Sequence, residues 1–405
     1  MSTPIMSDLP SQDLPREDLL RQDLLRQEIP TIKFTCAISN QSSRQDYVNT
    51  FENGACLADG HGTDGAFYAI HTCSEIEKRH TSGCKNIEDW SVEIDKNILP
   101  LKKEIDNSLE IIDGVPYRRD RIVHGGTTVT YISVDPVSKV MTVANAGDST
   151  GYVFALSEGV YLSHEITANH KPYSKAEYDR LEALRQSGKN VGRLVWNTTS
   201  GCCAPIFDDS GKMIDYFSDH KPVKDTTHAY QVAADALELD PTNTEKMEEK
   251  KKSLQAYQEA FKASSSSPTF EIHKRLIVGT VKGEYGCYLE GPKNTQCGLD
   301  TFLSCTVTIG DYHAKKVGAR SDWDVSYKPL GSFVGEKRMI FVASDGVHDC
   351  FTEEELAKLV LTTESDQELL DTFVAKSKEV FNTRKGGVLV QADDISFFRA
   401  DISHL

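Results

Sequence analysis

The close spacing of apolar segments between residues 127 and 156 constrains the fold more than any other feature of the sequence. Residues 127–134 alternate apolar and polar side chains, and residues 140–146 and 152–156 follow after short turns. Strands joined by such short turns pair in antiparallel fashion, because a parallel pair needs a crossover of about a dozen residues. The region therefore predicts an antiparallel meander, and it excludes a doubly wound parallel sheet.

Further strands are expected on both sides of this meander. Alternation begins at residue 31, with apolar side chains at Ile32, Phe34, Cys36 and Ile38, and a second strand ends at Asp59. Residues 339–343 form an apolar run typical of a buried strand, and a last strand includes Ile395 and Phe397.

Helices are predicted after several of these strands. One begins near Asp64, where Ala66, Ala69, Ile70, Cys73 and Ile76 recur at helical spacing. Others are expected over residues 92–112 and 175–184. Two more follow the capping-box pairs Thr352 with Glu355 and Ser365 with Glu368.

Composition limits the class of protein. A chain of 405 residues with 39% hydrophobic and 26% charged residues is typical of a soluble globular protein of one large domain or two. Its formal net charge of −16 argues against a nucleic-acid partner. No run approaches the ~18 apolar residues of a membrane span, so we expect no membrane association. Ten cysteines without a C-x-x-C pair indicate a reduced, cytoplasmic protein, with the nucleus left open as a second location.

The chain divides into a tail, a domain and an insertion. Residues 1–30 carry a short five-residue repeat bracketed by prolines and are expected to be a mobile tail. Residues 31–405 are expected to form one domain, with an insertion at about 191–300 that contains a charged helix at 242–262. The insertion is a candidate for control of substrate access or for binding a protein partner, and it is equally consistent with a tolerated surface addition. For the tail, a docking motif for a partner is the alternative to a mobile segment.

Aspartates recur at the ends of the predicted strands. Asp59 ends one strand, Asp148 occupies a turn, Asp345 ends a buried strand and Asp393 opens the last one. Any one of them could simply accept hydrogen bonds from turn amides. Together they would converge at one edge of the sheets, where their charges repel unless a cation lies between them. Oxygen ligands of this kind favour magnesium or manganese.

Ordered sequence blocks over about residues 31–400 resemble the metal-dependent type 2C protein phosphatase family. The blocks are residues 39–46, ADGHG at 58–62, GGTT at 125–128, ANAGDS at 144–149, TANHKP at 167–172 with residues 177–184, TIGD at 308–311, ASDGVHD at 343–349 and DDIS at 393–396. The resemblance implies an α+β fold in which two packed antiparallel β-sheets are flanked by helices.

The resemblance also implies a site for two Mg²⁺ or Mn²⁺ ions, with a weaker third. Asp59 would bridge the two metals, and the carbonyl of Gly60 would bind one of them. Asp345 and Asp393 would complete the other shell. Asp46 would hold metal-bound water. Asp148 would support the third ion.

The implied activity is hydrolysis of phosphoserine and phosphothreonine in phosphorylated proteins. Water activated by two metals would attack the phosphorus in line. His61, beside the bridging ligand, is the candidate that protonates the leaving seryl or threonyl oxygen, and Asp59 is the other candidate catalytic residue. No phosphoenzyme is needed, so no cysteine nucleophile is expected.

Four positions depart from the family's pattern. Gln41 stands where the family usually has an arginine that grips the substrate phosphate, and Arg44 is the nearby candidate to replace it. Gln45, His348 and Asp394 also differ from the usual residues. The departure at Gln41 motivates a second hypothesis, a weakly active or inactive phosphatase-like scaffold that binds partner proteins. The intact set Asp59, Asp345 and Asp393 argues for the enzyme.

Overall fold

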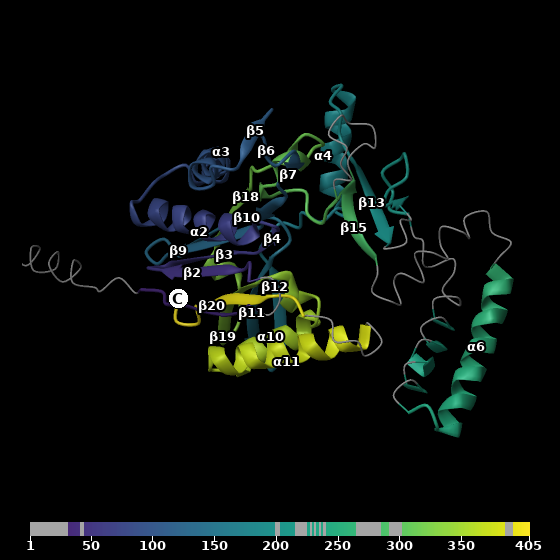
Figure 1. The fold of residues 1–405 in the computed structure, drawn as a ribbon. Helices are drawn as coiled ribbons and strands as arrows, with labels where there is room; N and C mark the ends of the chain where they lie inside the picture. Colours follow the sequence, from purple (N-terminus) through teal and green to yellow (C-terminus); the bar gives the residue numbers. More distant parts are fainter. Residues whose placement is uncertain are drawn as a thin grey trace, which may run out of the picture.

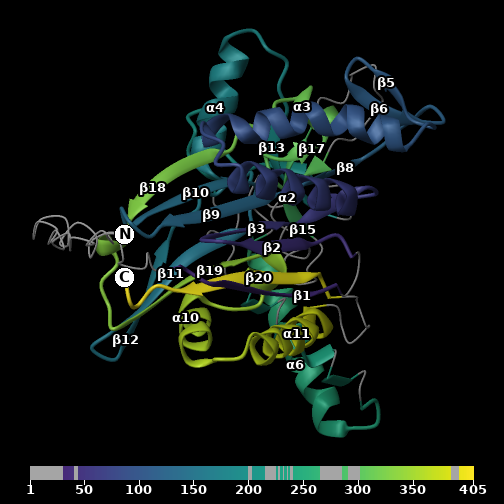
Figure 2. The same ribbon diagram turned by 90° about the vertical axis from the view of Figure 1, so that its left-hand side faces the viewer.

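Two packed β-sheets form the centre of the protein. The structure is a computed structural model that describes residues 31–40, 44–198, 203–214, 225–226, 229–230, 232–234, 236–237, 240–264, 285–290, 302–384 and 392–405. Within these residues two five-stranded antiparallel sheets face each other between two layers of helices (Figure 1, Figure 2). This arrangement confirms the predicted α+β sandwich.

The strand order brings distant segments together. The first sheet has the order β1 (Phe34–Ser39), β20 (Ile395–Asp401), β19 (Lys337–Ala343), β11 (Thr150–Ser157) and β12 (Val160–Glu165). The second has the order β18 (Asp324–Pro329), β10 (Val140–Ala146), β9 (Val129–Asp135), β3 (Gly54–Ala58) and β2 (Tyr47–Phe51). Side chains from both inner faces fill one apolar core that includes Leu57, Ile132, Val143, Val153, Ile340 and Phe398. Burial of this core stabilises the packing of the two sheets.

Helices cover the outer face of each sheet (Figure 2). The helices α2 (Gly65–Thr81) and α3 (Ile87–Ile105) pack over the second sheet. The helices α10 (Glu353–Thr362) and α11 (Asp366–Arg384) pack over the first. The predicted capping box of α10 is confirmed, because Glu355 N donates to Thr352 Oγ1 at 3.3 Å and Thr352 N donates to Glu355 Oε2 at 2.8 Å.

Some expectations for the strands were wrong. The predicted strand ending at Asp59 is a hairpin of β2 and β3, turned at Asn53, which adopts the left-handed conformation that asparagine tolerates. In the meander, β9 and β10 pair as predicted, but β11 pairs with β19 in the other sheet. The turn at Gly147 and Asp148 therefore crosses between the two sheets.

Two helix expectations also need correction. The helix predicted over 92–112 is α3, which begins at Ile87 and ends at Ile105, because Trp90, Ile94 and Ile98 form its buried stripe. The last residues of the predicted helix instead form strand β5 (Glu110–Ile112). On α2 the predicted apolar residue Ile70 is 43% exposed, because Tyr68, Ala69, Cys73 and Ile76 face the sheet.

In the described part of the chain, three small sheets lie outside the sandwich. One has the strand order β17 (Ile309–Gly310), β8 (Gly125–Thr127) and β4 (Gly60–Gly62). Another has the order β5 (Glu110–Ile112), β6 (Val115–Arg118) and β7 (Arg121–Ile122). The third has the order β14 (Cys203–Pro205), β13 (Arg193–Thr198), β15 (Tyr285–Glu290) and β16 (Phe302–Leu303). The last of these lies largely in the segment where no regular strands were expected. Its side chains share an apolar cluster with Leu181 of α4 (Lys175–Gln186) and Ala314 of α8 (Tyr312–Lys315).

The charged helix expected at 242–262 is α6 (Thr244–Ser264), which lies apart from the sandwich (Figure 1). Two further short elements among the described residues are α9 (Asp345–His348) and the 3₁₀ turn Leu330–Ser332. Across the described segments, every helix is too short or too polar to span a membrane.

Candidate active site

Five predicted carboxylates come from five different parts of the sandwich. Asp59 follows β3, Asp148 follows β10 and Asp345 follows β19, while Asp46 precedes β2 and Asp393 precedes β20. Burial raises the pKa of Asp59 well above its ordinary value, and the charges of Asp46, Asp345, Asp393 and Asp148 raise that pKa further. The two sheets therefore bring these carboxylates into one electrostatic cluster.

The other members of the cluster respond in the same direction. Burial raises the pKa of Asp46 to about 6, although Ser396 Oγ donates a hydrogen bond to its Oδ2 at 2.7 Å. The pKa of Asp345 is raised well above its usual range by burial and then by the charges of Asp148 and Asp393. Mutual repulsion of this kind is relieved when a cation lies among the carboxylates.

The donor chemistry of this cluster fits a hard divalent cation, which takes carboxylate and carbonyl oxygens as ligands. In the described part of the chain, no group of three or more His, Cys, Asp or Glu side chains is already arranged to hold a metal ion. The fit therefore rests on the kind of ligand and on the unbalanced negative charge of the cluster.

The backbone after Asp59 is held tightly. Its carbonyl oxygen accepts hydrogen bonds from Thr128 N at 2.9 Å and from Thr127 Oγ1 at 3.0 Å. A Cβ atom at Gly60 would lie 2.6 Å from the carbonyl oxygens of Gln45 and Gly65, so only glycine fits there. These contacts explain why the GGTT and DGHG blocks occur together.

His61 is paired with a residue to which the sequence reasoning gave no role. Its Nε2 lies 2.5 Å from Oδ2 of Asp311, which also accepts from Thr308 Oγ1 at 2.9 Å. A Cβ atom at Gly126 would collide with the Asp311 carboxylate, so this glycine makes room for the pair. Burial alone would lower the pKa of His61, but the charge and hydrogen bond of Asp311 raise that pKa above its ordinary value.

Lys171 is a second residue that the sequence reasoning left without a role. Burial opposes its charge, but the carboxylates of Asp148 and Asp345 raise the pKa of its ammonium group. In return, the charge of Lys171 lowers the pKa of both aspartates against the larger effect of burial. The position of Lys171 in the TANHKP block was the sequence signal that could have identified it as a site residue.

Arg44 is exposed and lies two residues before the buried Asp46. It adopts the left-handed conformation, with φ of 56°. Gln41 lies outside the described residues.

Gln45, the residue after Arg44, ties this loop to the site, because its Nε2 donates to the carbonyl of Gly62 at 2.5 Å and its N–H donates to Asp394 Oδ2 at 2.9 Å. Gln45 and Asp394, two departures from the family pattern, are thus bonded to each other.

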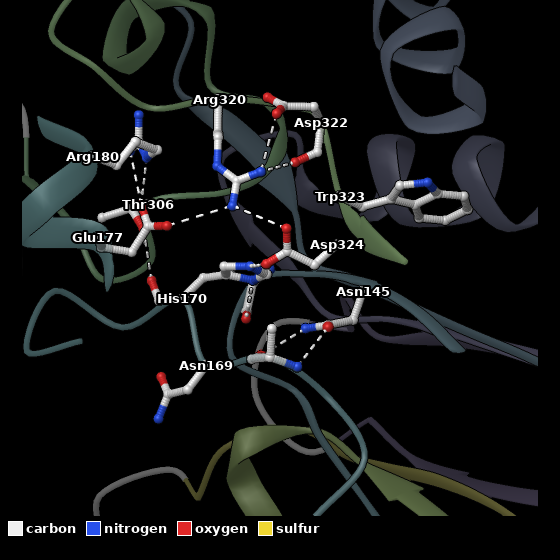
Figure 3. A network of polar contacts seen from close by, with 12 residues as sticks. Asn145, Asn169, His170, Glu177, Arg180, Thr306, Arg320, Asp322, Trp323 and Asp324 are labelled. Carbon is white, nitrogen blue, oxygen red and sulfur yellow. Dashed lines mark hydrogen bonds and ion pairs between the residues drawn. The ribbon is translucent and has the colours of Figure 1, made fainter. Parts of the chain in front are cut away.

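A network of polar side chains around His170 (Figure 3) supports the turn that holds Asp148. His170 is 1% exposed, and its Nδ1 accepts from Gly147 N at 3.1 Å while its Nε2 donates to Asp324 Oδ2 at 2.8 Å. Asp324 also pairs with Arg320 at 3.5 Å, and Arg320 pairs with Glu177 of α4 at 3.4 Å. The turn at Asp148 is therefore linked to α4 through charged side chains.

The fourth departure, His348, also has a structural contact. Its Nε2 donates to the carbonyl oxygen of Thr150 at 3.0 Å, which fastens α9 to β11. Burial lowers the pKa of His348 to about 4, so the side chain is neutral at physiological pH.

Comparisons with known proteins point to one family. Residues 38–200 match the family model described as protein phosphatase 2C. The solved structure of serine-threonine phosphatase 2C from Toxoplasma gondii is similar in fold, with a TM-score of 0.52 at 10% identity, covering 92% of this chain and 95% of that one. A C. elegans sex determining protein gives a TM-score of 0.46 at 14% identity, covering 95% and 69%. No curated protein matches the sequence.

Proposed function

We propose that this chain, which belongs to the protein phosphatase 2C family, is a metal-dependent phosphatase that acts on phosphoserine and phosphothreonine in proteins. The observation that carries the proposal is the convergence of Asp59, Asp345 and Asp393 beside the His61–Asp311 pair. Such a cluster combines a cation-binding face with a proton donor, the two requirements for hydrolysis of a phosphate monoester.

Specific residues would hold the metal ions. Asp59 with the Gly60 carbonyl, Asp345 and Asp393 would supply the main ligands, and Asp46 and Asp148 would supply further oxygen atoms. Two magnesium or manganese ions held there would lower the pKa of a water molecule and neutralise charge on the phosphoryl oxygens.

The chain's own residues control the proton and the charge balance. The charge of Asp311 raises the pKa of His61 and so favours its protonated form, whose Nδ1–H can protonate the leaving oxygen while Nε2–H stays bonded to Asp311. Asp311 therefore sets the orientation of the ring. The Lys171 ammonium group offsets part of the negative charge of Asp148 and Asp345.

A phosphatase-like scaffold is the second candidate function. It is favoured by the presence of Gln41 at the position where the family usually has a phosphate-binding arginine. The cluster of buried aspartates favours an enzyme, because repelling carboxylates lower the stability of the fold and serve no evident purpose in a scaffold. The two candidates differ in one measurable property, turnover.

Hydrolysis of a small aryl phosphate tests the proposed function. We expect turnover with added manganese, loss of turnover with EDTA and recovery when manganese is restored. Absence of turnover on both the aryl phosphate and phosphopeptides, for folded protein with manganese, would leave the scaffold as the better account.

A further inference from the structure

A basic pocket lies beside α4, away from the carboxylate cluster. It has a volume of about 640 Å³ and lies between α4, the loop after it and the chain that follows α8. Its cationic lining residues are Arg180, Lys189, Lys315, Lys316 and Arg320. Among the described lining residues the acidic one is Asp322. Neighbouring carboxylates offset the charges of Arg180, Lys315 and Arg320, so among the described residues the positive charge left without a carboxylate partner is that of Lys189 and Lys316. This local positive charge contrasts with the net charge of −16 of the whole chain.

The cations of the basic pocket fall into two groups. Arg180 and Arg320 pair with the buried Glu177 at 2.8 and 3.4 Å, and Lys315 pairs with Asp95 at 2.5 Å, so these three have fixed positions. Lys189 and Lys316 are exposed, and neither forms an ion pair with any residue that the structure describes. The pocket thus has a rigid charged wall and two ammonium groups at its rim that are available to a ligand.

The wall of the basic pocket is connected to the candidate active site. The helix α8, whose end contributes Lys315, begins directly after Asp311, the partner of His61. Arg320 contacts Asp324, which holds His170 against the turn that precedes Asp148 (Figure 3). A ligand in the pocket would therefore rest on the same segments that position the catalytic groups.

We propose that the basic pocket binds an acidic segment of the phosphoprotein substrate, a run of Asp and Glu side chains outside the phosphoryl group that is removed. This inference rests on the proposed function for its substrate class. A pocket of this volume accommodates several side chains. Because the molecule as a whole repels anions, a local cluster of cations gives an acidic substrate a preferred place to bind.

Direct binding tests the proposal without requiring turnover. The probe is a fluorescently labelled peptide of six glutamates without phosphate, measured by anisotropy at low ionic strength with the full chain. The test variant is the double substitution Lys189→Gln with Lys316→Gln. The matched control is Lys358→Gln with Lys378→Gln, which removes two exposed charges from α10 and α11 on the far side of the sandwich.

We expect the test variant to weaken binding by about five- to tenfold and the control by less than about twofold, since each surface charge contributes modestly. Binding should also weaken as salt is added. Equal binding by the test and control variants would overturn the proposal, as would equal binding of a hexaglutamine peptide by the unmodified chain.

Turnover then links the pocket to the substrate. The test variant should lower kcat/KM several-fold for a phosphothreonine peptide that carries an acidic segment, and leave kcat/KM for an aryl phosphate unchanged. An equal loss on both substrates would contradict a docking role. Absence of any turnover by the unmodified chain would instead refute the proposed function, and the peptide-binding result would still stand on its own.

Discussion

His61 Nε2 and Asp311 Oδ2 lie 2.5 Å apart although 250 residues separate them in the chain. The small sheet of β4, β8 and β17 creates this contact, because β8 pairs with β4 on one side and with β17 on the other. The pair orients the imidazole of His61, which follows Asp59 by two residues in the chain. The proton donation that we propose for His61 depends on this contact.

Asp311→Asn tests that role. Asparagine lacks the negative charge that stabilises a protonated His61, so kcat for a phosphoserine peptide should fall by at least about tenfold, a part of the roughly 10²- to 10⁴-fold that general acid catalysis contributes. An aryl phosphate has a good leaving group that needs little protonation, so its kcat should change much less. Comparison of kcat on the two substrates is the measurement.

His61→Ala supplies the control for this comparison. If the two residues act as one unit, the double variant should be no slower than His61→Ala alone. Equal losses on the peptide and the aryl phosphate would show that Asp311 affects folding or another step.

Arg44→Ala tests phosphate capture at the position that departs from the family pattern. Arg44 is exposed and lies two residues before Asp46, so loss of its guanidinium should raise KM for a phosphopeptide several-fold with little change in kcat. Arg119→Ala is a matched control, because Arg119 is also exposed and also left-handed, with φ of 51°. An unchanged KM in the Arg44 variant would remove this residue from the site.

Glu177→Gln tests the network that joins α4 to the Asp148 turn. Glu177 is 3% exposed and pairs with Arg180 and Arg320, so its loss leaves two guanidinium groups without their shared partner. The free energy of unfolding at pH 7 should fall by roughly 2–4 kcal/mol. Asp322→Asn removes the same charge from a carboxylate that is 61% exposed, and it should cost less than about 1 kcal/mol.

The stability lost in the Glu177→Gln variant should depend on pH. Burial would raise the pKa of Glu177, but Arg180, Thr306 and Arg320 hold that pKa below its ordinary value of 4.5. The ionised carboxylate therefore stabilises the fold above that value, and the stabilisation is lost as pH falls through the lowered pKa. Urea unfolding of the variant and the unmodified chain should converge in strongly acidic buffer. A constant difference across this range would contradict the ion-pair account.

Local patterns predicted much of the fold. The strand predicted at residues 140–146 is β10 over that same span, and the Thr352–Glu355 pair starts α10 as expected. Such signals depend on neighbours within a few residues, so they can be read directly from the chain. The same is true of the aspartates, whose common placement at strand ends led to the carboxylate cluster.

Features that depend on distant contacts could not be predicted in this way. The turn at Gly147 and Asp148 looks like a hairpin turn, and only the pairing of β11 with β19 reveals that it crosses between sheets. Asp311 resembles an ordinary turn residue until β17 is placed beside β8. His170 likewise gains its role from Asp324, 154 residues away. Sequence patterns identify the groups, whereas the tertiary structure identifies their partners.

Manganese-dependent phosphate release from a phosphothreonine peptide, by the unmodified chain and by Asp345→Asn, is the most direct test of the carboxylate cluster as a metal site. We predict release that rises to saturation with manganese, disappears with EDTA and falls by about 100-fold or more in the variant. The metal-free variant should be at least as stable as the unmodified chain, because one of several repelling carboxylates has become neutral. Release that is independent of manganese, or equal in the two proteins, would contradict the account.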